Sequence, residues 1–398
     1  MGRLISISTF TCPFCHLVFA HRSELEDHLR HEHPERQPRS ETGKIAPRSV
    51  QRFQCDRCRA ELAFTDARCP RCGVGLGYEP GSRTLQVFEP DEQGRSQRAD
   101  GVAMWRCLNA AWGCNWLLPV DPQQVWCRSC RLTRGRPDTS DTAAVQAWMT
   151  AEAAKRRIVH QLDSIGLPLR VHSAGGSREL TFDLVHVPGE PEVTGHRDGI
   201  ITLDLTEADE LHRATQRFGL REAFRTFVGH IRHELGHFYL TELVPAGRHD
   251  EFTRLFGDEQ LDYAAAVRAH YQHPLPDWRE RGYITAYASA HPFEDWAESF
   301  AHYLAIRDGA ETMVAYGAQP PRSQTSGWPA ELAVWRDGVT TMNAVAEGLG
   351  QGPVYPIVLT DAVVEKLAFV DECVRSRVGS GTAGDAGGTE AGGVGRDA

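Results

Sequence analysis

Ten of the eleven cysteines in this 398-residue chain fall between residues 12 and 130, mostly as C-x-x-C pairs. Thiolate pairs at this spacing are typical of structural zinc sites, which allow a small segment to fold without a large hydrophobic core. The chain opens without a basic segment followed by an apolar run, so we expect no export signal and a reducing, cytoplasmic environment. The cysteines therefore predict zinc modules and not disulfides.

Residues 1–35 have the spacing of a two-cysteine two-histidine zinc finger, with Phe19 and Leu25 at its two core positions. The predicted ligands are Cys12, Cys15, His28 and His33, with His31 as an alternative last ligand. The helix positions that would face DNA bases include Glu24 and Asp27, whose charges repel phosphate. We therefore favour a protein-docking or purely structural role for this finger over nucleic-acid binding.

A polar linker, residues 36–51, leads to a predicted double zinc-ribbon region at residues 52–138. Its cysteines form one C-x2-C-x10-C-x2-C set and one C-x6-C-x12-C-x2-C set, each suited to one structural zinc. The predicted ligands are Cys55, Cys58, Cys69 and Cys72 in the first set, and Cys107, Cys114, Cys127 and Cys130 in the second. Spacing alone leaves open an interleaved arrangement in which the sets exchange ligand pairs. Nearby tryptophans are expected to supply the core of the second module: Trp105, Trp112, Trp116 and Trp126.

Residues 139–376 predict one α+β domain, and the Gly-rich residues 377–398 are expected to be disordered. Helices are predicted over residues 144–162, 221–240, 293–306 and 361–377, and strands over 84–88, 180–187 and 199–205. The first of these helices is expected to begin after Thr139 or Ser140 and to end at Gly166. Cys373, in the last helix, is expected to be a small core residue.

The segment His233-Glu234-Leu-Gly-His237 lies in the predicted helix 221–240. Two histidines four residues apart share one helix face, so both imidazoles can reach one metal ion. Glu234 lies beside them, where it can take a proton from a metal-bound water. His230 is expected to be structural, because three histidines at this spacing would crowd one ion.

A catalytic zinc needs a third protein ligand, and Glu294 and Glu298 lie one helical turn apart in the predicted helix 293–306. In glutamate-ligand zincins, or gluzincins, the first acid of such a pair binds the metal and the second orients a histidine. We assign Glu294 as ligand and Glu298 as its supporting residue, with the reverse left open. Tyr287 is a candidate donor to an oxyanion, or an aromatic residue that fixes the loop, with Tyr283 as the reserve.

These motifs together resemble a known family. The cysteine sets, followed by TGHRDGIITLDL, GHIRHELGHFYL, FGDEQLDYAAA, AYASAHPFEDWAESFAHYL and YPIVLTDAVVEKLAFV, resemble the bacterial zinc-ribbon-containing zinc-binding metallopeptidases over roughly residues 52–376. The resemblance implies a zincin-like metallopeptidase fold and a metal site, more than any substrate. The glutamate pair and upstream tyrosine are also similar to those of the anthrax lethal factor group of zincins, which favours Glu294 and Tyr287. The N-terminal finger departs from the family pattern.

We therefore expect a bacterial zinc peptidase with one catalytic and about three structural zinc ions, acting on polypeptides. In zincins an edge strand lines the cleft, so the strand at 199–205 is a candidate for pairing with an extended substrate. The alternative is a regulator that binds nucleic acid or protein through its zinc modules and keeps the zincin domain as a non-catalytic scaffold. A third hypothesis is a peptidase held latent until a partner moves the ribbons. Residues 1–140 carry a net charge of only +4, against −14 for residues 141–398, and no apolar run is long enough to span a bilayer.

Overall fold

A computed structural model describes residues 52–98, 100–173, 176–185, 194–208, 226–320 and 326–384, with two short paired strands near the N-terminus. These strands, β1 (Phe10–Thr11) and β2 (Val18–Phe19), are antiparallel. The ligands predicted for the N-terminal finger lie outside the described residues: Cys12, Cys15, His28 and His33.

The ribbon region is built from short antiparallel strands. They are β3 (Phe53–Gln54), β4 (Glu61–Leu62), β5 (Leu76–Glu79), β6 (Thr84–Val87), β7 (Ser96–Gln97), β8 (Ala103–Arg106) and β9 (Leu117–Pro119). Strand β3 pairs with β4, β5 pairs with β6, and β8 lies between β7 and β9. Two 3-10 helices, η2 (Leu108–Trp112) and η3 (Cys130–Leu132), complete the second module. Trp116 and Trp126 are buried, and Trp105 and Trp112 pack against the same core, as predicted.

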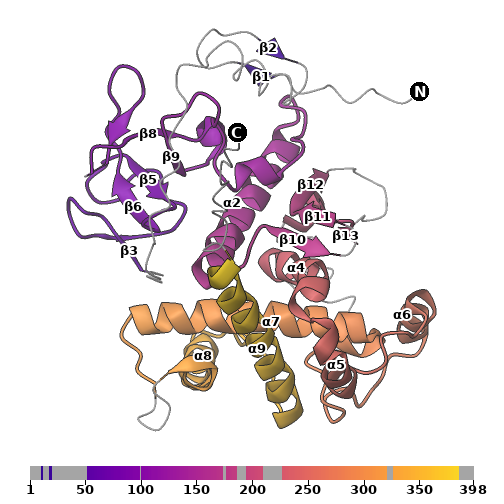
Figure 1. Ribbon diagram of the computed structural model, residues 1–398. Helices are drawn as coiled ribbons and strands as arrows, with labels where there is room; N and C mark the ends of the chain where they lie inside the picture. Colours follow the sequence, from indigo (N-terminus) through magenta and orange to yellow (C-terminus); the bar gives the residue numbers. More distant parts are fainter. Residues whose placement is uncertain are drawn as a thin grey trace, which may run out of the picture.

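Helix α2 (Thr142–Ile165) joins the ribbon region to the rest of the chain (Figure 1). Asp141 caps it by accepting a hydrogen bond from the Ala144 amide at 3.0 Å, so the predicted caps Thr139 and Ser140 are wrong by one or two residues. The helix ends at Gly166, whose φ of 77° is the left-handed conformation that glycine tolerates best. Hydrophobic residues of both ribbon modules share one core with α2.

The following strands form a small sheet and a hairpin. Strand β12 (Thr181–Val185) is parallel to β14 (Ile200–Asp204), and β13 (Gly195–Arg197) is antiparallel to β14, which gives the order β12-β14-β13. The hairpin consists of β10 (Arg170–Ser173) and β11 (Gly176–Glu179). The strand expected at 199–205 is therefore central and has no free edge on which a substrate could pair. The edge strand beside it is β13.

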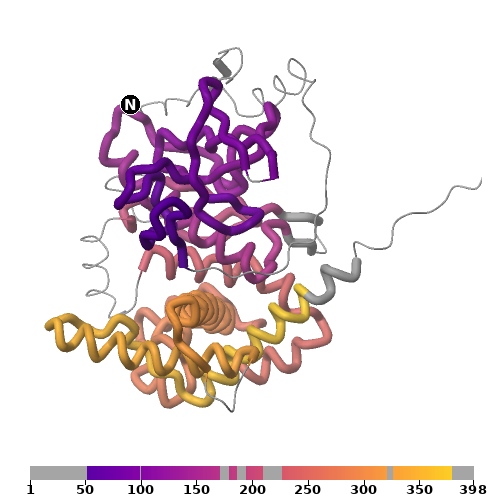
Figure 2. The backbone as a smooth tube through the Cα atoms, turned by 90° about the vertical axis from the view of Figure 1, so that its left-hand side faces the viewer, coloured from indigo at the N-terminus to yellow at the C-terminus, as the bar shows by residue number. Residues whose placement is uncertain are grey.

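Helices make up the remainder. They are α4 (Phe227–Leu243), α5 (His249–Phe256), α6 (Tyr263–Gln272), α7 (Pro292–Ala315), α8 (Gly327–Gly348) and α9 (Asp361–Gly384), with 3-10 helices η4 (Leu205–Ala208), η5 (Ala246–Arg248) and η6 (Tyr287–Ala290). Helix α7 is central: α4, α8 and α9 all pack on it. Figure 2 shows these orange and yellow helices below the ribbon strands.

Three details of this helical part bear on the predictions from sequence. Helix α9 extends to Gly384, past residue 376, where the domain was expected to end. Cys373 is 1% exposed, as predicted for a core residue. None of the helices in the described part of the chain combines the length and apolar character needed to cross a bilayer.

Candidate metal centre

Helix α4 presents the two histidines of the HExxH motif on one face. Thr226 caps the helix by accepting a hydrogen bond from the Gly229 amide at 2.9 Å. Ile231 and Leu235 are fully buried, so they fix the rotation of the helix about its axis. His233 and His237 consequently stand one turn apart, with ring centroids 4.9 Å from each other.

A close helix crossing brings the third acidic residue to these histidines. A Cβ atom added at Gly236 would lie 2.7 Å from the Cα atom of Ala297 on α7, a distance that real Cβ atoms do not reach. The Trp296 indole donates a hydrogen bond to the Gly236 carbonyl at 2.9 Å, which ties the helices together at the same point. The glycine of the motif therefore allows the backbones of α4 and α7 to approach each other.

Three side-chain atoms converge at this crossing. The Nε2 atoms of His233 and His237 are 3.2 Å apart, and Glu294 Oε2 lies 3.0 Å from the first and 3.5 Å from the second. Glu294 is 1% exposed, and its Oε2 atom makes no hydrogen bond of acceptable geometry within the described part of the chain. A buried carboxylate oxygen without a hydrogen bond, facing two imidazole nitrogens, fits the nitrogen and oxygen ligand set of a zinc ion.

The remaining polar atoms of two of these residues are held by other side chains. His233 Nδ1 lies 2.6 Å from Glu298 Oε1, and Thr285 donates a hydrogen bond to Glu298 Oε2 at 2.8 Å. Glu294 Oε1 accepts a hydrogen bond from the Tyr263 hydroxyl at 2.6 Å. The structure thus places Glu294 at the Nε2 edge of His233 and Glu298 at its Nδ1 edge.

Glu234 lies beside the converging atoms without joining them. It is 5% exposed, and its Oε1 atom is 3.4 Å from His230 Nε2. His230 Nδ1 lies 2.5 Å from Glu207 Oε2, and Thr194 donates a hydrogen bond to Glu207 Oε1 at 2.8 Å. His230 is therefore separate from the His-His-Glu group. It supports Glu234, the acid of the HExxH motif.

Burial and charge set the protonation of this site. Burial opposes ionisation of Glu294, but the adjacent imidazoles outweigh it and lower the pKa of Glu294 well below its usual range. Burial likewise opposes the charge of Glu298, yet His233 lowers its pKa to about 2. Burial, reinforced by the negative charge of Glu294, raises the pKa of Tyr263 and Tyr287 far above neutrality, so both hydroxyls remain protonated donors.

The converging atoms line an open cleft of about 1540 Å³. Tyr287 forms part of its wall, with its ring 5.9 Å from that of His233, whereas the reserve candidate Tyr283 packs against the core beneath Lys366. Strand β13 also contributes Gly195 and His196 to the lining. The ligand-like atoms are therefore accessible from an open cleft.

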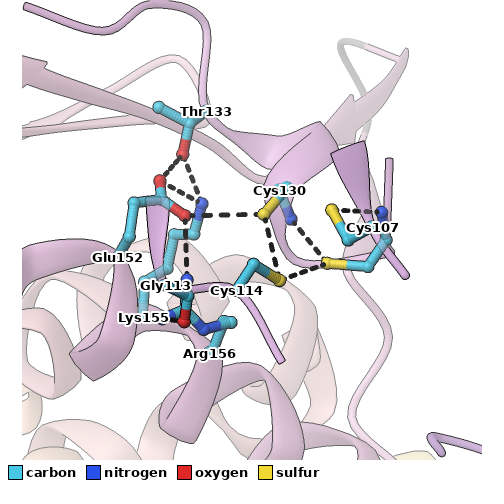
Figure 3. A network of polar contacts seen from close by, with 9 residues as sticks. Cys107, Gly113, Cys114, Cys130, Thr133, Glu152, Lys155 and Arg156 are labelled. Atoms are coloured by element: carbon cyan, nitrogen blue, oxygen red, sulfur yellow. Dashed lines mark hydrogen bonds and ion pairs between the residues drawn. The ribbon is translucent and has the colours of Figure 1, made fainter. Parts of the chain in front are cut away.

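The cysteines form two further groups, each from one consecutive set. In the first, Cys55 lies 3.8 Å from Cys72 and Cys58 lies 3.5 Å from Cys69, measured between sulfur atoms. In the second, Cys114 Sγ is 3.8 Å from Cys127 Sγ and 3.7 Å from Cys130 Sγ (Figure 3). Within each set, all four sulfur atoms lie within 4.8 Å of one another. This excludes the interleaved arrangement, and both groups suit tetrahedral zinc.

Three residues around the centre were absent from the sequence predictions: Tyr263, Thr285 and Glu207. Each contacts a motif residue that is 13 to 31 positions away in sequence. No spacing rule links residues so far apart when they lie on different elements. Only the FGDEQLDYAAA segment, which contains Tyr263, was singled out at all, as part of the family resemblance.

A helical domain with a His-His-Glu group on two crossing helices, preceded by two four-cysteine modules, defines a zinc-metallopeptidase-like protein. Residues 144–373 match the family described as "Putative zinc-binding metallo-peptidase", and residues 52–141 match a zinc-ribbon domain. The chain belongs to this metallopeptidase family. It is also 36% identical over 332 residues to proteins named as uncharacterized from Mycobacterium bovis and Mycobacterium tuberculosis, covering 81% of this chain and 94% of each relative. No solved structure matches it.

Proposed function

We propose that this chain is a zinc-dependent peptidase of the gluzincin type that acts on polypeptides in the cytoplasm. The observation that carries the proposal is the convergence of His233 Nε2, His237 Nε2 and Glu294 Oε2, at separations of 3.0 to 3.5 Å, on the wall of an open cleft. Three protein ligands beside open space are typical of catalytic zinc sites, whereas structural sites have four.

In this proposal His233, His237 and Glu294 hold the zinc, and Glu298 fixes the orientation of His233 through its Nδ1 atom. A zinc ion held this way supplies Lewis acidity, which polarises a carbonyl group and lowers the pKa of water. The Glu234 carboxylate accepts the proton of the attacking water as the new carbon–oxygen bond forms. It then returns that proton to the departing amine as the carbon–nitrogen bond breaks.

Glu234 and Tyr287 have properties suited to these roles. Burial disfavours the charge on Glu234, but His230 and the neighbouring imidazoles lower its pKa, so it is an ionised proton acceptor at neutral pH. Tyr287 faces the cleft with a protonated hydroxyl that can donate a hydrogen bond to the oxygen on which negative charge develops. Such donors are worth about 10²- to 10³-fold in turnover in other hydrolases.

The decisive experiment compares metal content and hydrolysis in the full-length chain. Wild type is expected to hold four zinc ions: one in each four-cysteine group, one in the His-His-Glu group and one in the predicted finger. Glu234→Gln should retain all four and lose about 10²- to 10⁴-fold of turnover. His233→Ala should lose one zinc ion selectively and leave both ribbons folded.

Comparing the cleavage products of a proteome treated with wild type and with Glu234→Gln would reveal the substrates. A wild-type chain that holds zinc in the His-His-Glu group yet cleaves nothing more than Glu234→Gln would overturn the peptidase proposal. That result would favour a regulator in which the metallopeptidase domain is a scaffold.

A further inference from the structure

Tyr263 is the first residue of α6 and lies against the start of α7. Asp262 caps α6 by accepting a hydrogen bond from the Ala265 amide at 2.9 Å. The Tyr263 ring packs edge-on against His291, with centroids 5.2 Å apart, and His291 Nε2 lies 3.1 Å from the Leu261 carbonyl. His291 is the N-cap residue of α7, which carries Glu294. The tyrosine is thus held at both its backbone and its ring.

The Tyr263 hydroxyl contacts only one of the two carboxylate oxygens of Glu294, so the two oxygens have different surroundings. The hydroxyl donates to Oε1 at 2.6 Å, while Oε2 faces the imidazoles and has no hydrogen-bond partner among the described residues. A carboxylate free to rotate about its terminal torsion would offer either oxygen, or both, to an ion. A donor fixed on one oxygen removes that freedom.

We propose that Tyr263 is a positioning residue for the third zinc ligand, an inference that rests on the zinc site of the proposed function. Its hydroxyl holds Glu294 Oε1 so that Oε2 alone points to the ion. Glu298 performs the corresponding task for His233, which it contacts at Nδ1 at 2.6 Å. Residues that orient metal ligands in this way contribute about 10- to 100-fold to metal affinity.

Tyr263 and Tyr287, two of the three tyrosines that line the cleft, make different contacts. Tyr263 contacts a ligand carboxylate, and Tyr287 stands over His233 on the cleft wall. Helix α6 has no buried residue among its ten, all of which are described, so Tyr263 is not needed to fill a core. Replacing it with phenylalanine keeps the ring contact with His291 and removes only the hydroxyl.

Zinc itself is the probe for the test. The catalytic zinc is removed from the full-length chain with a chelator mild enough to leave the cysteine-bound zinc ions in place. Zinc affinity of the emptied group is then measured by competition with a chromophoric chelator. Tyr263→Phe is expected to bind zinc about 10- to 100-fold more weakly than wild type. Tyr271→Phe, a hydroxyl removal on the same helix and in the same cleft, should bind zinc as wild type does.

A second background shows whether Tyr263 acts through Glu294. In a Glu294→Gln chain the carboxylate is gone, so adding Tyr263→Phe should change zinc affinity by less than about 3-fold, because coupled residues are non-additive. An equal loss in both backgrounds, or no loss in either, would overturn the inference. If wild type itself binds no zinc in this group, the proposed function fails instead, and the two failures are distinguishable.

Discussion

The two four-cysteine groups have the same ligand set but different surroundings. In the first group Cys72 is exposed and Cys58 is half-buried, whereas all four cysteines of the second group are buried. The first group therefore lies at the surface of its module, and the second lies between its module and α2. Both modules contribute to the core shared with α2, so the difference lies in the exposure of the candidate metal ligands: only the second group is completely enclosed.

Polar contacts connect the second group to α2 (Figure 3). Cys130 Sγ lies 3.8 Å from Glu152 Oε2, and Glu152 pairs with Lys155 at 2.8 Å. Thr133 donates a hydrogen bond to Glu152 Oε1 at 2.5 Å, and Lys155 also contacts Thr133. Glu152 is 1% exposed and Lys155 is fully buried. This charge network would leave unpaired ions in the core if one member were lost.

Helix α2 extends the connection to the helices of the metal centre. Gln161 donates a hydrogen bond to the Leu304 carbonyl of α7 at 2.5 Å and accepts one from Arg232 of α4 at 3.1 Å. Arg157 and Arg232 both pair with Asp308 of α7, at 3.0 and 3.1 Å. The second ribbon is therefore connected, through one helix, to both elements that supply the His-His-Glu group.

The largest expected effect compares one ligand from each group. Cys130→Ser should release the zinc of the second group and lower the free energy of unfolding of the whole chain by about 5 kcal/mol. Cys72→Ser should lower it by no more than about 2 kcal/mol, because a surface module can open locally. Thermal denaturation followed by zinc release measures both. Equal losses from the two variants would show that burial does not distinguish the groups.

A second comparison uses two ion pairs, one on α2 beside the second cysteine group and one in the first ribbon. Lys155→Met leaves Glu152 buried without its partner and should cost about 3 to 5 kcal/mol of folding free energy. Adding Glu152→Gln should recover part of that loss, since the unpaired charge is removed. Arg52→Met breaks the exposed pair with Glu61 in the first ribbon, whose N···O distance is 2.5 Å, and should leave unfolding unchanged. Denaturant titration of wild type and the three variants decides this.

A third comparison concerns the crossing of α4 and α7 at the His-His-Glu group. Neither four-cysteine group lies at such a crossing. Gly236→Ala should force α4 away from α7, cost about 1 to 3 kcal/mol of stability and weaken zinc binding by the His-His-Glu group. Gly247→Ala is the control, since a Cβ there meets nothing within 4 Å. Zinc affinity unchanged in Gly236→Ala would mean that the group tolerates a wider crossing.

Local features of this molecule could be predicted from sequence, and long-range ones could not. The cysteine sets and the HExxH histidines lie close in sequence, so spacing alone brought the right residues together. Glu294 and Glu298 were identified as a pair because they share a helix face, and their separate roles were assigned from the glutamate pair known in related zincins, with the reverse left open. The helix crossing that places them at the two edges of His233 is not encoded in the spacing. Tyr263 lies 31 residues before Glu294 on another helix and was missed for that reason.

The same limit explains one error of topology and one contact that was not predicted. The side chains of β14 alternate as those of an edge strand would. In the structure a turn after β13 brings β14 back beside it, so that β13 covers the otherwise free side of β14. The common core of the ribbons and α2 was not foreseen either. His160 of α2 lies 2.6 Å from the Tyr78 hydroxyl, a contact between residues 82 positions apart.

The smallest expected effect tests the contact of the second ribbon with α2 through pH. Burial raises the pKa of Asp163 on α2 to about 6. Arg128, which lies in sequence between the ligands Cys127 and Cys130, pairs with Asp163 at 2.7 Å and opposes this rise in pKa. The folded chain therefore holds this proton more tightly than the unfolded chain, and the resulting stability is present at low pH and is lost as pH rises through 6. Relative to Asp163→Asn, wild type should lose about 1 kcal/mol of unfolding free energy between pH 5 and pH 7. Zinc release contributes equally to the pH dependence of both chains, so it cancels in the difference between them. A pH-independent difference would show that Asp163 is in contact with solvent and would contradict a buried contact between the second ribbon and α2.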